Sequence, residues 1–484
     1  MSLAASACTT GPARRRRPPP GQLVIPTSLR VGIAEPTSID PAHLDSPSAL
    51  LVGSQIFDGL TVLDPVSGEP QPALGARWSV SKNGRTTEFR LRRGVRFHDG
   101  SPVRAADFVF AWNRLASPRT HSPYAFLLER VSGYQDLHVK GKATALAGLQ
   151  AVGDNVLPAT LDAPWPGFAA LTAHPALSPV PPSAADLSYD AQPVGNGPYQ
   201  VREPWGLGSP IHLERATTYY GQPAAIDSLD FDVYRDAESG WPDFESGNLD
   251  IAAIPPSLVA DAESRYGTEG IVTLARLPYC GFNLDLPQFQ DVKLRRAVSL
   301  ALERETIAAT VYGPTALPAT GIVPPSIPGA VPDACGDGCR QDVDRAATLV
   351  RQLSQASRTF ELDLTRSDVG RALRSSISSQ LAAAGFIVRP RFLGEADYGD
   401  LLKQRGQQVF CLVWDADTPR QEAFLDPLLS ASSPDNQTEV KAESLDRLPD
   451  RARATPVRAT RLRTYVEAER AAFSLMPLVT ASPS

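Results

Sequence analysis

The sequence lacks any apolar run as long as the roughly 18 residues that a membrane-spanning helix needs. It also lacks the G-x-S-x-G, H-E-x-x-H and Walker A motifs of common enzyme classes. The histidines are scattered, and none is paired at the spacing of metal ligands. We therefore predict that the protein is not an enzyme, and we expect neither a cofactor nor a metal site. The six histidines are His43, His98, His121, His138, His174 and His212.

Positive charge is also in deficit. The net charge is -6 at pH 7 and the pI is about 5.7, and no basic domain is evident, which disfavours nucleic acid as a partner. With 484 residues, of which 42% are hydrophobic, the chain exceeds one ordinary domain, so we expect two or three lobes. The 45 prolines fit a loop-rich α/β protein.

Cysteine is scarce, with five residues in the chain. Cys335 and Cys339 bound the turn-like sequence CGDGC, where a disulfide would form in an exported protein. Two free thiols are the alternative, and a metal site is disfavoured because no second ligand pair stands at suitable spacing. Cys280 and Cys411 lie in apolar, strand-like runs, so we predict buried free thiols for both.

The fifth cysteine, Cys8, ends the small-residue sequence MSLAASAC. This ending is similar to that of a lipoprotein signal peptide, with Cys8 as the lipidated residue; an ordinary N-terminus with an incidental cysteine is the alternative. Residues 9–28 follow as a linker rich in arginine and proline, which we expect to be extended and without a fold.

Strand and helix patterns alternate along most of the remaining chain. Period-two alternation predicts a strand at 155–162, and helical periodicity predicts a helix at 104–115. We expect further helices from 292 to about 307 and from about 456 to 473. Such alternation indicates an α/β protein.

Three segments carry a distinctive order of motifs. Residues 38–128 contain RGVRFHDGSPVRAADFVFAW, residues 193–221 contain GNGPYQV and LERATTYYG, and residues 289–305 read FQDVKLRRAVSLALERE. The GNG is not a dinucleotide-binding motif, because no helix follows it and Gln200 stands where the third glycine would be. In this order the segments resemble the solute-binding proteins of ABC importers in the oligopeptide/dipeptide/nickel family, and the oligopeptide binders most closely.

The resemblance implies a bilobal periplasmic-binding-protein-like α/β fold of the large, three-domain type. Lobe I would combine 29–70 with 196–274, and lobe II would span 275–475. An extra domain would occupy 71–195. A short return segment, 476–484, would follow, with a hinge between the two lobes.

The same resemblance indicates a ligand site in the sequence WDADTP that follows the strand-like run VFCLVW. In the family, a tryptophan in this segment lines the peptide site and an aspartate pairs with the peptide's α-ammonium group; these positions match Trp414 and Asp417. By looser matches Tyr124, Tyr398 and Asp45 would join the site. The alternatives are core packing for Trp414, a helix cap near Pro419 for Asp417 and ordinary turn chemistry for Asp45.

The function that follows is that of an extracytoplasmic receptor that captures peptides by hinge closure and delivers them to the permease and ATPase subunits of an importer. We expect a monomer that is anchored to the outer face of the cell membrane by lipid on Cys8, or free in the periplasm. Another solute on the same fold, such as a nickel chelate or a sugar, is one alternative. A ligand sensor or chaperone without an importer is another.

Overall fold

The computed structural model describes residues 27–186, 188–272, 275–313 and 316–480. Its contacts group these residues into two compact units. The first contains the described residues up to Asp58, together with Gly94–Val103 and Pro179–Ile254; the second contains the remainder. The three-domain division of the chain stays a prediction.

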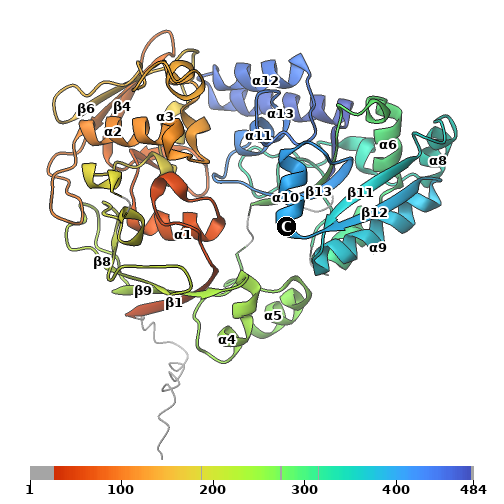
Figure 1. Cartoon of the computed structure of the whole chain (residues 1–484), viewed down its shortest axis with the longest axis horizontal. Helices are drawn as coiled ribbons and strands as arrows, with labels where there is room; N and C mark the ends of the chain where they lie inside the picture. The colour runs from red at the N-terminus through yellow and green to blue at the C-terminus, as the bar shows by residue number, and fades with distance from the viewer. Residues whose placement is uncertain (1–26, 187, 273–274, 314–315, 481–484) are drawn as a thin grey trace, which may run out of the picture. The chain divides into compact units, whose positions relative to one another are not determined.

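The first unit is built on a four-stranded sheet of order β1-β9-β8-β7 (Figure 1). The strands are β1 (Ser28–Ala34), β7 (Tyr199–Val201), β8 (Ile211–Arg215) and β9 (Ser228–Tyr234). β1 runs parallel to β9, and the other neighbours are antiparallel. The helices of this unit are α1 (Pro47–Ile56) and α4 (Trp241–Glu245).

The GNG sequence at residues 195–197 packs closely against the end of α1. A Cβ atom on Gly195 would stand 2.1 Å from the carbonyl oxygen of Ile56, at the end of α1, so a side chain cannot be accommodated there. Between the two glycines, Asn196 donates from Nδ2 to the carbonyl of Asp58 at 3.0 Å. These contacts tie the motif to the end of α1.

The second unit contains a five-stranded sheet of order β12-β11-β13-β10-β14. Its strands are β10 (Arg276–Phe282), β11 (Thr359–Thr365), β12 (Ile387–Leu393), β13 (Val409–Asp415) and β14 (Leu478–Thr480). β11 is parallel to both β12 and β13, whereas β10 is antiparallel to β13 and β14.

Helices cover this sheet and extend beyond it (Figure 1). They are α5 (Val259–Tyr266), α6 (Val292–Ala301), α7 (Arg304–Ile307), α8 (Val343–Arg351), α9 (Asp368–Ala383), α10 (Glu395–Lys403), α11 (Glu422–Leu429), α12 (Glu443–Arg453) and α13 (Arg458–Leu475). None of the helices in the described part of the chain is long and apolar enough to cross a membrane.

The N-terminal part of the second unit holds two small sheets, β2-β3 and β4-β5-β6. Its elements are β2 (Thr61–Leu63), β3 (Pro70–Pro72), β4 (Gly75–Val80), β5 (Thr86–Leu91), α2 (Ala105–Ala116), β6 (Val156–Thr160) and α3 (Phe168–Leu171). Trp112, on α2, is buried edge-on against Phe168 and donates from Nε1 to the carbonyl of Leu177 at 2.8 Å. The strand predicted at 155–162 and the helix predicted at 104–115 are confirmed as β6 and α2.

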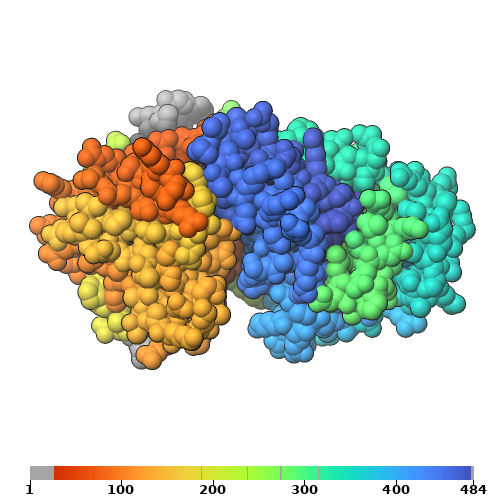
Figure 2. All heavy atoms as spheres, turned by 90° about the horizontal axis from the view of Figure 1, so that it is seen from above, coloured from red at the N-terminus to blue at the C-terminus, as the bar shows by residue number. Residues whose placement is uncertain are grey.

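Within the second unit, the C-terminal helices lie against this N-terminal part; in Figure 2 the blue surface meets the orange surface there. Glu69 accepts from Arg458 at 3.0 Å and from Arg461 at 2.9 Å. Arg130 pairs with Asp450 of α12. Ion pairs therefore join chain segments more than 300 residues apart.

The prediction of free thiols at Cys280 and Cys411 is wrong. The two residues face each other directly in the antiparallel pair β10-β13, with Cα atoms 4.0 Å apart, and they form a disulfide. Directly opposed residues of an antiparallel pair can come close enough for this bond, which the local sequence of each strand does not reveal. A second disulfide joins Cys335 to Cys339, as the spacing within CGDGC allowed.

The helix predicted from 292 to about 307 is divided. α6 ends at Ala301, Leu302 is extended, and α7 begins at Arg304. The side chain of Glu303 accepts hydrogen bonds from the backbone N–H groups of Glu305 and Thr306, so it caps a new helix.

Candidate ligand-binding site

An open cavity of about 160 Å³ lies within the second unit. Two stretches far apart in the sequence line it, one between Phe126 and His174 and the other between Trp414 and Arg453. Aromatic and aliphatic side chains share the lining with charged ones. The predicted residues Trp414 and Asp417 both belong to it.

Asp417 faces a buried histidine in this cavity. Oδ2 of Asp417 lies 3.7 Å from Nε2 of His174, whose side chain is 1% exposed while that of Asp417 is 29% exposed. Nδ1 of His174 accepts from the backbone N–H of Ala176 at 3.1 Å, so in the neutral ring the proton is on Nε2. Nε2 has no hydrogen-bond partner among the described residues. A donor group is thus directed toward the carboxylate.

Trp414 is the penultimate residue of β13, and Asp417 stands in the loop that joins β13 to α11. The indole Nε1 of Trp414 donates to the carbonyl of Ala423, in the first turn of α11, at 2.8 Å. Asp417 does not cap this helix, since the N-cap position is Gln421 and it makes no side-chain cap bond. Of the alternatives for these residues, the helix cap is therefore wrong.

Two ion pairs contribute to the lining of the cavity. Nε of Arg420 pairs with Oε1 of Glu422 at 2.6 Å, and Arg453 pairs with Asp426. Burial would raise the pKa of Glu422, but the charge and hydrogen bond of Arg420, together with the charges of Arg461 and Arg453, lower it below its ordinary value. Burial outweighs the charge of Arg453 at Asp426 and raises the pKa of that carboxyl to about 6.

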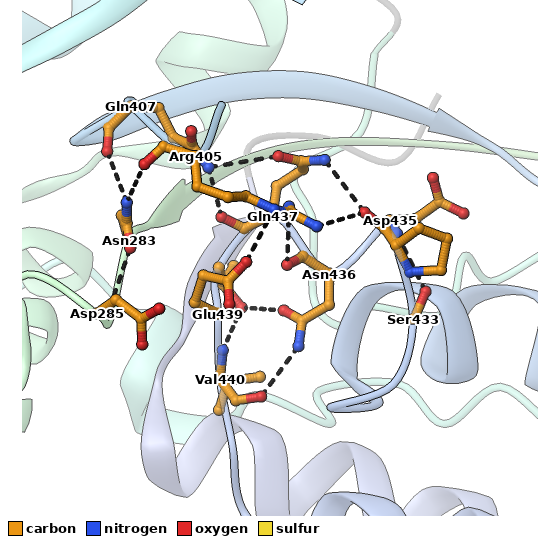
Figure 3. Close-up of polar contacts among 12 residues, drawn as sticks. Asn283, Asp285, Arg405, Gln407, Ser433, Asp435, Asn436, Gln437, Glu439 and Val440 are labelled. Carbon is orange, nitrogen blue, oxygen red and sulfur yellow. Dashed lines mark hydrogen bonds and ion pairs between the residues drawn. The ribbon is translucent and has the colours of Figure 1, made fainter. Parts of the chain in front are cut away.

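Asp435 reaches the cavity from the loop between α11 and α12. Figure 3 shows how this loop is held: Arg405 donates to the carbonyls of Pro434 and Asn436 and pairs with Glu439 at 2.9 Å. Asn436 in turn donates from Nδ2 to the carbonyl of Val440 at 2.9 Å. The carboxylate of Asp435 points away from these bonds, so the loop is anchored independently of it.

The other predicted site residues lie elsewhere. Tyr124 stands behind the cavity wall, with its ring 4.6 Å from that of His174. Tyr398 is buried in the core and donates from its hydroxyl to the carbonyl of Cys411 at 2.9 Å. Asp45, in the first unit, accepts from the hydroxyl of Thr37 at 2.6 Å. A ligand contact at each of these three residues stays a prediction, and Cys8 lies outside the described residues.

His174 and Asp435 were not predicted from the sequence as site residues. His174 stands between small and apolar residues with no second ligand-type residue near it, and Asp435 follows Ser-Ser-Pro as a turn residue commonly does. Only the folded chain brings them to one cavity.

Comparison with known proteins now identifies the class. Residues 69–436 match the sequence profile described as "Bacterial extracellular solute-binding proteins, family 5 Middle". The chain belongs to this family.

Individual relatives agree with the family. The periplasmic oligopeptide-binding protein OppA of Escherichia coli is 28% identical over 92% of this chain and 84% of its own. The probable deoxycholate-binding periplasmic protein YgiS of the same organism is also 28% identical, over 92% and 86%. The solved structure of Burkholderia pseudomallei OppA superimposes with a TM-score of 0.80 at 24% identity, over 95% of this chain and 94% of that one. The predicted periplasmic-binding-protein fold is confirmed.

Proposed function

We propose that this protein is the peptide receptor of an ABC importer and that Asp417 receives the α-ammonium group of the peptide. One observation carries the proposal. The carboxylate of Asp417 faces an aromatic-walled cavity beside Trp414 and has no lysine or arginine within ion-pair distance among the described residues. A carboxylate in that position is suited to a cation that the solute brings.

The chemistry of the wall supports an ammonium group over an anion. An ion pair in a partly buried site must offset the cost of removing both charges from water. The donor at Nε2 of His174, 3.7 Å from Oδ2 of Asp417, marks this side of the cavity as a place for a carboxylate. Aromatic faces such as that of Trp414 also attract cations. Backbone hydrogen bonds to an extended peptide would add affinity with little dependence on its side chains.

A steroid carboxylate is the second candidate, because one relative is named as probably deoxycholate-binding. The apolar part of the wall, which includes Phe126, Leu171 and Trp165, would suit such a solute. Its negative charge would meet Asp417 and Asp435, however, so we rank it below a peptide. A nickel chelate, a sugar or a sensor role without an importer ranks lower still, since no specific contact favours any of them.

We place the protein outside the cytoplasm, because the family is described as one of extracellular solute-binding proteins. The two disulfides support this placement, because such bonds persist in oxidising compartments. We further propose a monomer that is anchored by lipid on Cys8 and works with permease and ATPase subunits of the importer.

Native mass spectrometry of the purified protein, followed by mild denaturation, tests the proposal. We expect a set of co-purified short peptides, or, in an empty preparation, a peptide-induced rise in melting temperature. An empty protein that ignores a peptide library but is stabilised by deoxycholate would overturn the proposal in favour of the second candidate.

A further inference from the structure

The charges that line the cavity do not balance. Five acidic residues contribute to the lining, against three arginines. The acids are Glu129, Asp417, Glu422, Asp426 and Asp435, and the arginines are Arg130, Arg420 and Arg453. The lining therefore carries two more negative than positive groups, with His174 as a further, titratable member.

Each arginine of the lining is already paired. Arg420 is bound to Glu422 and Arg453 to Asp426, and each of these acids lines the cavity as well. Arg130 is bound to Asp450 and also lies 3.8 Å from Glu129, which accounts for a third acid of the lining. None of the three is placed to neutralise an acid across the cavity.

Asp417 and Asp435 are the two acids left over. Among the described residues no lysine or arginine forms an ion pair with Asp435, and the neighbouring Arg405 is occupied by Glu439 and by two backbone carbonyls. Burial, and then the negative charge of Asp417, raise the pKa of Asp435. Two carboxylates that repel each other in a half-buried cavity are stabilised by added positive charge.

His174 provides an independent sign that this wall is built for a ligand. Its side chain is almost wholly buried, its Nδ1 is fixed by the N–H of Ala176, and its Nε2 is directed at Asp417 without a hydrogen bond in the described chain. A buried donor left without a bond costs free energy, which an acceptor such as a carbonyl oxygen of the bound solute would recover.

We propose that the cavity selects solutes with two positive charges, and that Asp435 binds the basic side chain of a peptide whose first residue is lysine or arginine. This inference rests on the proposed function, because it places the α-ammonium of the same residue on Asp417. The methylene stem would run along the apolar lining, which includes Trp165, Leu171 and Trp414.

An organic dication fits this arrangement better than a metal ion. No three histidine, cysteine or acidic side chains converge closely enough to hold a metal among the residues that the structure describes. An N-terminal lysine or arginine, by contrast, carries its two positive charges at opposite ends of one residue, so each charge can face a different carboxylate. The selectivity would therefore be for the charge of the first side chain and not for its bulk.

Isothermal titration calorimetry with four tetrapeptides tests the inference. The peptides end in Ala-Ala-Ala and begin with lysine, arginine, norleucine or glutamate; norleucine keeps the stem of lysine without its charge. We expect the lysine and arginine peptides to bind at least about tenfold more tightly than the norleucine peptide, the worth of one charge-assisted hydrogen bond. The glutamate peptide should bind most weakly.

Two variants of Asp435 and one matched control complete the test. In Asp435→Asn the preference for lysine over norleucine should vanish while the affinity for norleucine stays, and in Asp435→Glu the preference should persist. Asp285→Asn is the matched control: it removes an acid that pairs with Lys441 and belongs to the group of polar contacts in Figure 3. This variant should leave the affinities and the preference for lysine unchanged. Circular dichroism melts show whether each variant is folded.

The outcomes separate the inference from the proposed function. If peptides bind but the lysine and norleucine peptides bind alike, or if the preference survives in Asp435→Asn, the inference is overturned and the receptor function stands. If no peptide binds to the folded protein, the proposed function fails and the inference falls with it.

Discussion

The indole of Trp414 donates its hydrogen bond to the carbonyl of Ala423, and that carbonyl lies four residues before Pro427 within α11. A proline inside a helix has no N–H to offer the carbonyl four residues earlier. The side chain of Trp414 supplies the missing donor. The bond therefore joins the end of β13 to the first turn of α11, and the loop that carries Asp417 lies between these two points.

Replacing Trp414 tests whether its indole N–H takes the place of the backbone donor that is missing at Pro427. Trp414→Phe keeps an aromatic ring but leaves the carbonyl of Ala423 without its donor, so we expect a loss of about 1–2 kcal/mol in the free energy of unfolding. In a Pro427→Ala background the backbone N–H of residue 427 can bind Ala423, and the same change should cost less. Urea unfolding of the four proteins measures the difference, and an equal cost in both backgrounds would refute the coupling.

The two disulfides should contribute unequally. Cys280–Cys411 closes a loop with a sequence separation of 131, whereas Cys335–Cys339 spans only 4. In the chain-entropy account the longer loop adds about 3 kcal/mol more to stability than the shorter one. We expect the paired alanine variant of Cys280 and Cys411 to melt well below that of Cys335 and Cys339. The reverse order would show that strain or residual structure dominates.

Glu469 should make stability depend on pH. It is 1% exposed, and its Oε1 accepts from the N–H groups of Ile322 at 2.6 Å and Val323 at 2.9 Å. Burial raises its pKa to about 6 from an ordinary value of 4.5. The folded state therefore binds the proton on Glu469 more tightly than the unfolded state does. The contribution of Glu469 to the free energy of unfolding consequently falls as the pH rises from about 4.5 to 6, and it no longer changes at higher pH.

Glu469→Gln keeps the oxygen acceptor and removes the charge. We expect the variant to gain about 2 kcal/mol in the free energy of unfolding at pH 8 and to match the wild type near pH 4, below both pKa values. Urea unfolding of both proteins across this range provides the measurement. A variant that is less stable at pH 8 would mean that the carboxylate has a partner worth more than the cost of its burial.

Part of this account could be predicted from the sequence. The alternation of apolar residues predicted β6 and α2, and a resemblance of motifs indicated the family and the segment with Trp414 and Asp417. Signals of this kind are local: they depend on residues within one strand, one helix or one loop.

The remainder depends on pairings that local sequence does not specify. The Cys280–Cys411 bond follows from the register of β10 against β13. α11 contains Pro427, a residue that argues against a helix when the sequence is read alone. The position of His174 opposite Asp417 depends on the packing of segments more than 200 residues apart. No sequence pattern around His174 or Asp417 predicts that the two side chains lie close together.

Calorimetry on Asp417→Asn tests the central claim most directly. The wild type and the variant are titrated with tetra-alanine and with its N-acetylated form, which lacks the α-ammonium group. We predict that the variant binds tetra-alanine at least about tenfold more weakly than the wild type, and that the acetylated peptide binds both proteins with the same low affinity. Equal affinity of the folded variant and the wild type for tetra-alanine would contradict the account and remove Asp417 from the site.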